Sequence, residues 1–469
     1  MTKLNGWKMV AAAVVVGVAT TSIALGQTIN FIVLFDGTNG AFPDGSLIQG
    51  TDGHAYGTTS AGGANGSGTV FTIMPTGILT TLYSFCSQSG CPDGKTPEGA
   101  VIQAPDGKLY GTTLYGGAYQ EGTVFKISAA GALTTLYSFC AQTNCTDGAN
   151  PNGGLVVGND GSLYGTTFGG GYSYNEDGTI FKITTEGQLT TLYRFSLSGV
   201  DGYYPINPLV QATDGDFYGT TSEGGAYSEG TVFKIAAGGA LTTLHSFDAA
   251  DGQNSYGALV QGIDGNFYGT TFYGGSSVCN DGCGTVFKMT PSGVITTIDP
   301  FDSKVVSHPQ TGLIQATDGN FYGTTADGNL FEISPNGSFT VLGVTNGMIF
   351  GAGLVQATSG TFYGVTYTGG DSGCGSNTTC GTVFSLNTGL GRFIRLQQDL
   401  GKIGQTSGIL GQGFTGTTGV SLNGTPASFT VVSDTFLKAT IPAGATTGYV
   451  TVTTPSGTLT SNVPFTVIP

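Results

Sequence analysis

One short phrase recurs along the chain at nearly constant spacing. A Tyr-Gly-Thr-Thr core occurs six times, and a degenerate copy, Tyr-Gly-Val-Thr, begins at Tyr363. The complete copies begin at Tyr56, Tyr110, Tyr164, Tyr218, Tyr268 and Tyr322. Successive copies are 54, 54, 54, 50, 54 and 41 residues apart. Periods of this length are typical of solenoids, repeat arrays and propellers, so one structural unit is expected to be used repeatedly.

Each unit contains four strand-like segments, which we name A to D. In the fourth unit, A is residues 208–212, and an Asp214-Gly215 turn leads to B, the stretch FYGTTS. Glycine-rich connections then lead to C at residues 230–235 and to D at residues 241–247. The segments are rich in β-branched and aromatic residues, and Asp-Gly is a strong hairpin signal. Seven such units predict an all-β fold, a seven-bladed β-propeller with four-stranded blades.

The ring-closing strand has two candidates. Residues 31–35, FIVLF, precede any A segment and resemble a D segment without its own unit. Residues 391–396, GRFIRL, stand where the seventh unit expects its own D segment. Either segment could complete the last blade, and the sequence leaves the choice open.

The loops fall into two classes. The A–B and C–D connections are short turns, whereas the B–C and D–A connections are long and variable, so binding is expected on the face that carries the long loops. All eight cysteines lie in those long loops, in four close pairs. The pairs are Cys86/Cys91, Cys140/Cys145, Cys279/Cys283 and Cys374/Cys380. Zinc would need four converging ligands, commonly in C-x2-C pairs, so we predict four local disulfides instead.

The amino terminus predicts export. Residues 1–26 combine Lys3 and Lys8, an apolar run and a small-x-small ending, which is typical of a signal peptide, and the mature chain is expected to begin at Gln27. Removal of the two lysines leaves 12 basic and 29 acidic residues, a net charge of −17. A surface of this charge repels nucleic acid and anionic lipid, and no nucleic-acid partner is expected. No later stretch could span a membrane, so we expect an extracellular, cell-surface or periplasmic protein.

Two family resemblances cover most of the mature chain. The pattern YGTTSEGGAYSEGTVFKI…GALTTLHSF resembles the GloVer tandem repeat of exported "choice-of-anchor" proteins over about residues 46–396, with a kelch-like double glycine after segment B. We expect the propeller itself to span residues 27–396. Residues 397–469, with ILGQGF, VSLNGTPASF and ATIPAGATTGYVTVTTPSG, resemble an IPT/TIG domain, which implies an immunoglobulin-like β-sandwich. The resemblance implies an exported propeller and brings no catalytic residues with it.

Tyrosines and acids recur in the B–C loops. The candidate ligand-binding residues are Tyr115, Tyr119, Glu121, Tyr172, Tyr174, Asp177, Tyr227, Glu229 and Tyr273. Tyrosine rings can stack on sugars while carboxylates accept hydrogen bonds from their hydroxyls. Tyrosine is also common in protein interfaces. The alternatives are therefore a glycan site, a protein-binding surface and plain packing within the loops.

Four aspartates recur in the D–A loops. They are Asp93, Asp147, Asp201 and Asp251, each followed by glycine. In a propeller they could form an arc near one mouth of the channel and bind Ca²⁺, because hard cations prefer several oxygen ligands. The alternative is that each aspartate starts a tight turn by bonding to the local backbone.

The sequence contains few signatures of catalysis. The chain has three histidines and lacks a serine elbow, a P-loop and an HExxH motif. The leading hypothesis is a non-catalytic binding or adhesion protein that presents its long loops to a glycan or surface protein. The alternatives are a carboxylate-dependent glycoside hydrolase or lyase, and a structural envelope or matrix component. No cofactor other than Ca²⁺ is expected.

Overall fold

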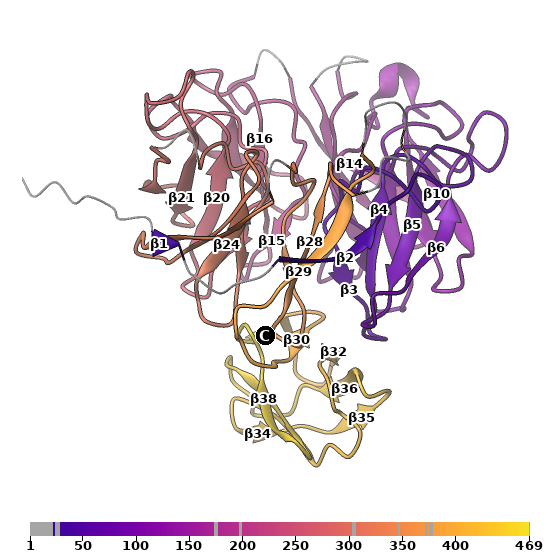
Figure 1. Cartoon of the computed structure of the whole chain (residues 1–469), viewed down its shortest axis with the longest axis vertical. Coiled ribbons are helices and arrows are strands. Elements are labelled where there is room, and N and C mark those ends of the chain that lie inside the picture. Colours follow the sequence, from indigo (N-terminus) through magenta and orange to yellow (C-terminus); the bar gives the residue numbers. More distant parts are fainter. Residues whose placement is uncertain are drawn as a thin grey trace, which may run out of the picture.

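The computed structural model describes residues 22–23, 29–172, 177–196, 199–302, 306–345, 348–370, 374 and 379–468. In these residues the chain is all-β apart from one short 3-10 turn, Thr143–Cys145. Sheets of four antiparallel strands follow one another along the repeats, and a separate group of sheets follows at the carboxyl end (Figure 1). The prediction of an all-β chain is therefore confirmed.

The first four complete repeats each form one sheet in chain order. The first sheet contains β3 (Ile48–Gln49), β4 (Ala55–Thr59), β5 (Thr69–Ile73) and β6 (Leu79–Ser84). The second contains β7 (Ile102–Gln103), β8 (Leu109–Thr113), β9 (Thr123–Ile127) and β10 (Leu133–Ser138). The third contains β11 (Val156–Val157), β12 (Leu163–Thr167), β13 (Thr179–Ile183) and β14 (Leu189–Arg194). The fourth contains β15 (Val210–Gln211), β16 (Phe217–Thr221), β17 (Thr231–Ile235) and β18 (Leu241–Ser246).

The remaining repeats depart slightly from this plan. The fifth sheet contains β19 (Val260–Gln261), β20 (Phe267–Thr271), β21 (Thr285–Met289) and β22 (Ile295–Asp299). The sixth contains β23 (Ile314–Gln315), β24 (Phe321–Thr324), β25 (Asn329–Ile333) and β26 (Phe339–Val344), with β1 (Ser22–Ile23) parallel to β26. The last contains β27 (Val355–Gln356), β28 (Phe362–Thr366), β29 (Thr382–Leu386) and β2 (Ile29–Leu34). Thus β1 places two residues of the predicted signal peptide against a sheet edge.

The amino-terminal strand completes the last sheet. Strand β2 pairs antiparallel with β29, from Ile29 opposite Leu386 to Leu34 opposite Thr382. The competing segment contributes β30 (Arg395–Leu396) to a carboxyl-terminal sheet instead. The first and last repeat sheets are also joined by Gln49, whose side chain accepts from Thr358 N at 2.9 Å and donates to Thr358 Oγ1 at 3.0 Å.

The repeat core has a separate structural task for each residue. The tyrosine hydroxyl donates to the aspartate four residues earlier, as Tyr218 does to Asp214 at 2.8 Å. The glycine leaves room for the strand-C phenylalanine, since a Cβ on Gly219 would lie 2.6 Å from the ring of Phe233. The second threonine bonds to the first threonine of strand C, as in Thr221 and Thr231 at 2.9 Å. The phrase therefore specifies packing inside and between sheets.

The carboxyl-terminal region has its own core. One sheet has the order β30, β32 (Thr406–Leu410), β36 (Phe436–Thr440) and β35 (Phe429–Val431). A second has the order β34 (Thr425–Pro426), β33 (Gly419–Leu422), β37 (Val450–Thr454) and β38 (Gly457–Thr460), and β31 (Leu400–Lys402) pairs with β39 (Thr466–Ile468). Buried apolar residues from both larger sheets, including Leu437 and Val452, form one cluster. Burial of such a cluster is the main favourable term in folding.

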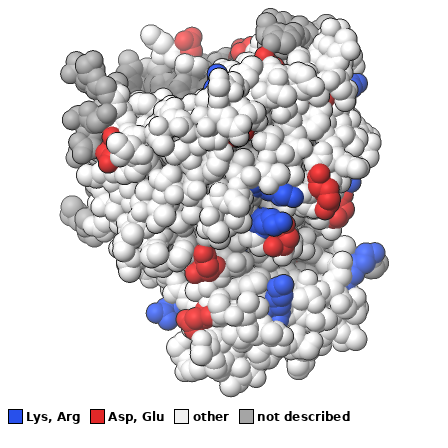
Figure 2. All heavy atoms as spheres, turned by 90° about the vertical axis from the view of Figure 1, so that its right-hand side faces the viewer, with Lys and Arg blue, Asp and Glu red and all other residues white. Residues whose placement is uncertain are grey.

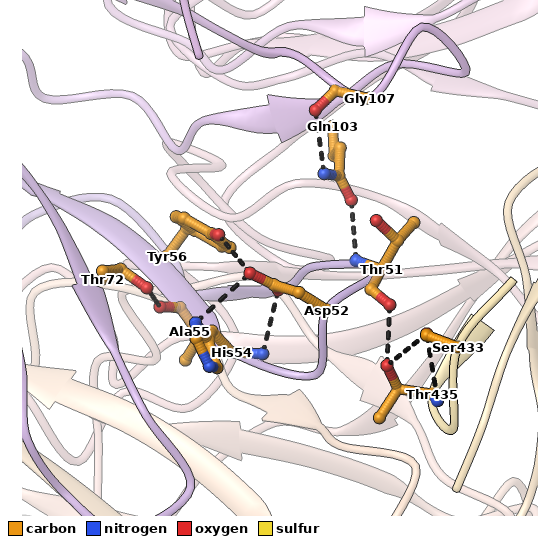
Figure 3. Close-up of polar contacts among 10 residues, drawn as sticks. All are labelled: Thr51, Asp52, His54, Ala55, Tyr56, Thr72, Gln103, Gly107, Ser433 and Thr435. Carbon is orange, nitrogen blue, oxygen red and sulfur yellow. Dashed lines mark hydrogen bonds and ion pairs between the residues drawn. The ribbon is translucent and has the colours of Figure 1, made fainter. Parts of the chain in front are cut away.

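The carboxyl-terminal region lies against the face of the repeats that carries the short turns (Figure 1). Thr435 donates to the carbonyl of Thr51 at 2.8 Å, in the A–B turn of the first repeat (Figure 3). Phe393 N donates to the carbonyl of Thr358 at 3.1 Å, and Arg395 donates to the carbonyl of Gln356. Desolvation lowers the pKa of Arg395 to about 10. These contacts leave the long loops on the opposite side.

Candidate functional site

A cavity of about 270 Å³ lies where the strand-A ends of all repeats converge. One position per repeat recurs in its lining, just before strand A on the side of the D–A loops. These residues are Asp44, Glu98, Asn152, Ile206, Tyr256, Gln310 and Gly351. Their spacing repeats the 54, 54, 54, 50, 54 and 41 residues of the Tyr-Gly-Thr-Thr core. We call this space the mouth cavity.

Close backbone contacts between sheets build the wall of the mouth cavity. Thr58 Oγ1, from the first Thr of the repeat core, donates to the carbonyl of Gly99 at 3.1 Å in the next sheet. A Cβ on Gly99 would lie 3.1 Å from the carbonyl oxygen of Gly153. A side chain there would press on backbone, so glycine permits the approach. Contacts of this kind hold the residue before the glycine, Glu98 in this repeat, at the wall of the mouth cavity.

Two neighbouring carboxyl groups give the mouth cavity its chemistry. Burial, followed by the charge of Glu98, raises the pKa of Asp44 to about 7, although a hydrogen bond with Ser60 acts in the opposite direction. Burial also raises the pKa of Glu98, and the side chain of Asn152 partly offsets this by donating to Glu98 Oε2 at 2.9 Å. Desolvation and a like charge both disfavour the ionised form. Near neutral pH the pair can therefore both donate and accept a proton.

The opposite side of the mouth cavity is less charged. Tyr256, Gln310 and Ile206 contribute an aromatic ring, an amide and an aliphatic side chain. Burial raises the pKa of Tyr256, so its hydroxyl stays a hydrogen-bond donor at neutral pH. Figure 2 shows the molecule from the side, where charged side chains are scattered over a mostly uncharged surface. A small polar ligand would thus meet carboxyl and amide groups on one side and a ring on the other.

The sequence-predicted tyrosines lie outside this lining. Tyr115, Tyr119, Tyr172 and Tyr227 are exposed on the B–C loops. Tyr273 is half-buried, with its ring 4.7 Å from Phe272 and 5.6 Å from His308. Tyr174 is outside the described residues. These four exposed tyrosines, which we call the rim, lie on the B–C loops of the second, third and fourth repeats.

The predicted acidic partners of these tyrosines differ in exposure. Asp177 is buried, and Glu121 and Glu229 are half-buried. The backbone carbonyls of Glu121 and Glu229 accept hydrogen bonds from Asn150 and Asn254 of the next D–A loop, at 2.8 and 3.0 Å. In the described residues the B–C loops are therefore fastened to the neighbouring D–A loops.

The recurring aspartates also lie away from the mouth cavity. Each carboxylate bonds to the aromatic residue of strand D in its own sheet. The pairs are Tyr83–Asp93 at 2.8 Å, Tyr137–Asp147 at 2.7 Å, Tyr193–Asp201 at 2.6 Å and His245–Asp251 at 2.7 Å. Asp93 and Asp147 additionally accept backbone N–H groups, as expected of turn aspartates. In the described residues no cluster of three or more His, Cys, Asp or Glu side chains is arranged to hold a metal ion.

The cysteines pair as predicted. The disulfides join Cys86 to Cys91, Cys140 to Cys145, Cys279 to Cys283 and Cys374 to Cys380. Four disulfides are consistent with an exported protein. Within the described part of the chain, no helix has both the length and the apolar character needed to cross a membrane.

Sequence reasoning missed Asp44 and Glu98. They occupy the same register of consecutive repeats, in PDG and PEG, where later repeats have PNG, PIN and SYG. Patterns shared between the copies do not reveal this position, because its residue type changes at every repeat. A comparison of the variable positions in the repeat frame is the signal that could have found it.

These features place the chain among all-β proteins with a propeller-like fold, and comparison with known proteins agrees. The model of the Gloeobacter/Verrucomicrobia repeat family matches residues 16–146 and 140–332, more than half of the chain, so the chain belongs to this family. No curated protein matches it. A streptogramin B lyase structure is 14% identical, with a TM-score of 0.55, over 78% of this chain and 99% of that chain.

A luciferin-regenerating enzyme is a more distant likeness. It is 11% identical, with a TM-score of 0.42, over 78% of this chain and 98% of that chain. At these identities the likeness to the lyase concerns the fold alone.

Proposed function

We propose that the chain is an exported binding protein: a seven-bladed β-propeller followed by an immunoglobulin-like, IPT/TIG-like domain. The bonds between Gln49 and Thr358 and the strand pair β2–β29 support a closed ring. The two larger carboxyl-terminal sheets, packed around one apolar cluster, support a sandwich. The loop-rich face would then be the exposed working surface, at the cell surface or beyond it.

The ligand of this face is the end of a glycan, bound in the mouth cavity. The observation that carries this proposal is the group of Asp44, Glu98 and Asn152 on one side of the cavity, with the Tyr256 ring among the other lining residues. Carboxyl and amide groups can pair with adjacent sugar hydroxyls, and an aromatic face packs on the C–H surface of a sugar. The exposed tyrosines of the rim would contact further sugar units or a surface protein.

A glycan array of residues 27–469, with and without Ca²⁺, tests this function. Saturable binding to one sugar class is expected, and it should weaken at least tenfold in Glu98→Gln, measured by calorimetry. Glu186→Gln is the matched control, because Glu186 is exposed in a C–D turn. A blank array, or equal affinity of the two variants, would contradict the mouth-cavity proposal.

The same measurements also test the other two candidate sites, the D–A loop aspartates and the exposed tyrosines. Calcium dependence that is lost when Asp93, Asp147, Asp201 and Asp251 are changed to asparagine would assign a metal role to these aspartates. Binding that depends on Tyr119 and Tyr172 but not on Glu98 would move the glycan or protein partner to the rim.

Acid–base catalysis on a carbohydrate is a second candidate function. It is favoured by the raised pKa of Asp44, about 7, beside a second carboxyl group. A carboxyl group poised near neutral pH can deliver a proton to a leaving oxygen while its neighbour accepts one, as glycoside hydrolysis or lyase chemistry requires. Turnover of the bound glycan that Asp44→Asn abolishes without loss of binding would establish this function over simple binding.

A further inference from the structure

The junctions between neighbouring repeat sheets are filled by a recurring ring stack. The core tyrosine of one repeat faces the residue just before the core tyrosine of the next. In four junctions that residue is phenylalanine. The pairs are Tyr164–Phe217, Tyr218–Phe267, Tyr268–Phe321 and Tyr322–Phe362, with ring centroids 4.1, 4.0, 3.9 and 4.5 Å apart. Leu109 and Leu163 fill the same place against Tyr56 and Tyr110.

The junction between the last and first repeats breaks this pattern. The residue facing Tyr363 is Ala55, the smallest at this position in any repeat. The aspartate that accepts from the tyrosine hydroxyl in the other repeats is replaced by Ser359. The residue paired with the tyrosine across the sheet, lysine in four repeats, is Ser385. One tyrosine has therefore lost its stacking ring, its carboxylate and its lysine.

These three replacements meet in one cavity of about 260 Å³. Ala55, Ser359, Tyr363 and Ser385 all line it, together with apolar side chains such as Ile32 and Val355. Burial raises the pKa of Tyr363, and in the described part of the chain its hydroxyl makes no hydrogen bond to protein. The exposed turn residues Met74 and Pro75 also line the cavity, so it is reachable from solvent.

We call this space the junction cavity. Its size and its lining meet the requirements for binding an aromatic ring. An apolar protein cavity of about 150 Å³ takes up benzene, so about 260 Å³ has room for a ring with a substituent. The ring would take the place that phenylalanine occupies in the other junctions, against Tyr363. The hydroxyls of Ser359, Ser385 and Tyr363 would meet its polar group. The junction and mouth cavities share no lining residue.

We propose that the junction cavity binds a small planar aromatic molecule that carries one polar group, of the phenol or indole class. Only Trp7, within the predicted signal peptide, is tryptophan, so indole fluorescence would report binding directly in residues 27–469. The test is titration of this chain with indole and, by calorimetry, with phenol and toluene. Saturable binding of indole is expected, and phenol should bind more tightly than toluene.

The decisive variant is Ala55→Phe, which restores the missing ring. This variant should lower the affinity for indole at least tenfold. It should also raise the melting temperature of the chain, because the new side chain fills a cavity. Ile78→Phe is the matched control, because Ile78 is 58% exposed in the same repeat and should leave indole binding unchanged. If Ala55→Phe does not fold, Tyr363→Leu, which removes the ring face, should weaken indole equally.

Two results would overturn this proposal. One is the absence of saturable binding of indole, phenol and toluene to the unmodified chain. The other is binding that survives both Ala55→Phe and Tyr363→Leu, which would place the ligand elsewhere. The mouth-cavity variant Glu98→Gln should leave indole affinity unchanged, so failure of one site is distinguishable from failure of the other.

Discussion

The carboxyl group of Asp44 couples the proposed site to pH. Its folded-state pKa of about 7 lies above the ordinary aspartate value of 3.8, because burial and Glu98 oppose ionisation. The folded chain therefore binds the proton more tightly than the unfolded chain between these values. This contribution to stability is complete below about pH 4 and is lost as the pH rises through 7.

Replacement of Asp44 by asparagine tests this linkage. Asp44→Asn should flatten the fall in unfolding free energy between pH 5 and 8, and at pH 8 it should stabilise the chain by roughly 1–3 kcal/mol. Urea denaturation at pH 5 and pH 8 measures this difference. Asp36→Asn serves as a control, since backbone and side-chain hydrogen bonds lower the pKa of that exposed carboxylate. An unchanged pH profile in Asp44→Asn would refute the assignment.

The A strands are linked around the repeats by glutamine side chains. Gln211 accepts from the backbone N–H of Asn159 in the preceding repeat at 2.9 Å, and donates to the carbonyl of Gly215 in its own turn, also at 2.9 Å. Figure 3 shows the same arrangement at Gln103, which accepts from Thr51 and donates to Gly107. The glutamines thus satisfy backbone groups between sheets.

Every repeat except the third has a glutamine at this strand-A position. The exception follows from the chemical structure of a proline in the neighbouring repeat. In the third repeat Val157 replaces glutamine, and the residue that would donate to it is Pro105, which has no backbone N–H. An amide at position 157 would have no such donor to accept from. The absence of glutamine at position 157 is therefore explained by the absence of a backbone N–H at position 105.

A double-mutant cycle tests this pairing. Val157→Gln alone should lower the unfolding free energy by about 1–3 kcal/mol, because its amide oxygen lacks a partner. Adding Pro105→Thr should recover about 1 kcal/mol or more, as the new N–H donates to the amide. Denaturation of the two single variants and the double variant gives the coupling energy. Additive losses would show that the pairing is coincidental.

Strand β2 completes the last repeat sheet although it lies far in sequence from its partner β29. Val33 of β2 is 8% exposed and packs in the core between the first and last sheets, whereas the adjacent Leu34 is 54% exposed. Strand alternation places the two on opposite faces. A charge at position 33 would therefore be buried in the junction that closes the repeats.

We expect Val33→Asp to destabilise the chain by at least about 3 kcal/mol, because an unpaired charge would be buried. Leu34→Asp should change stability by less than about 1 kcal/mol. Thermal unfolding of the two variants compares adjacent positions in one strand. Equal melting temperatures would mean that β2 does not hold the last sheet together.

Much of the fold could be predicted because its signals are local. The Asp-Gly turns, the strand alternation and the disulfides involve residues close together in the chain, and the sheets and cysteine pairs agree with prediction. The pairing of β2 could not be predicted, since both FIVLF and GRFIRL have strand-forming residues. Strand β30 of the second segment pairs instead with β32 of the carboxyl-terminal region, while Arg395 in that strand donates to the carbonyl of Gln356 in the last repeat.

The sites depended on longer contacts. Sequence established the repeat, its glycine and threonine positions and the loops that bear tyrosines, because each repeat carries the same local rules. Folding brought Asp44 beside Glu98 of the next repeat, and Tyr363 beside Ala55. The second pair meets where the last sheet joins the first, as do Gln49 and Thr358, which are 309 positions apart. No local pattern encodes a contact of that range, so only packing of the complete chain selects the residues that share a cavity.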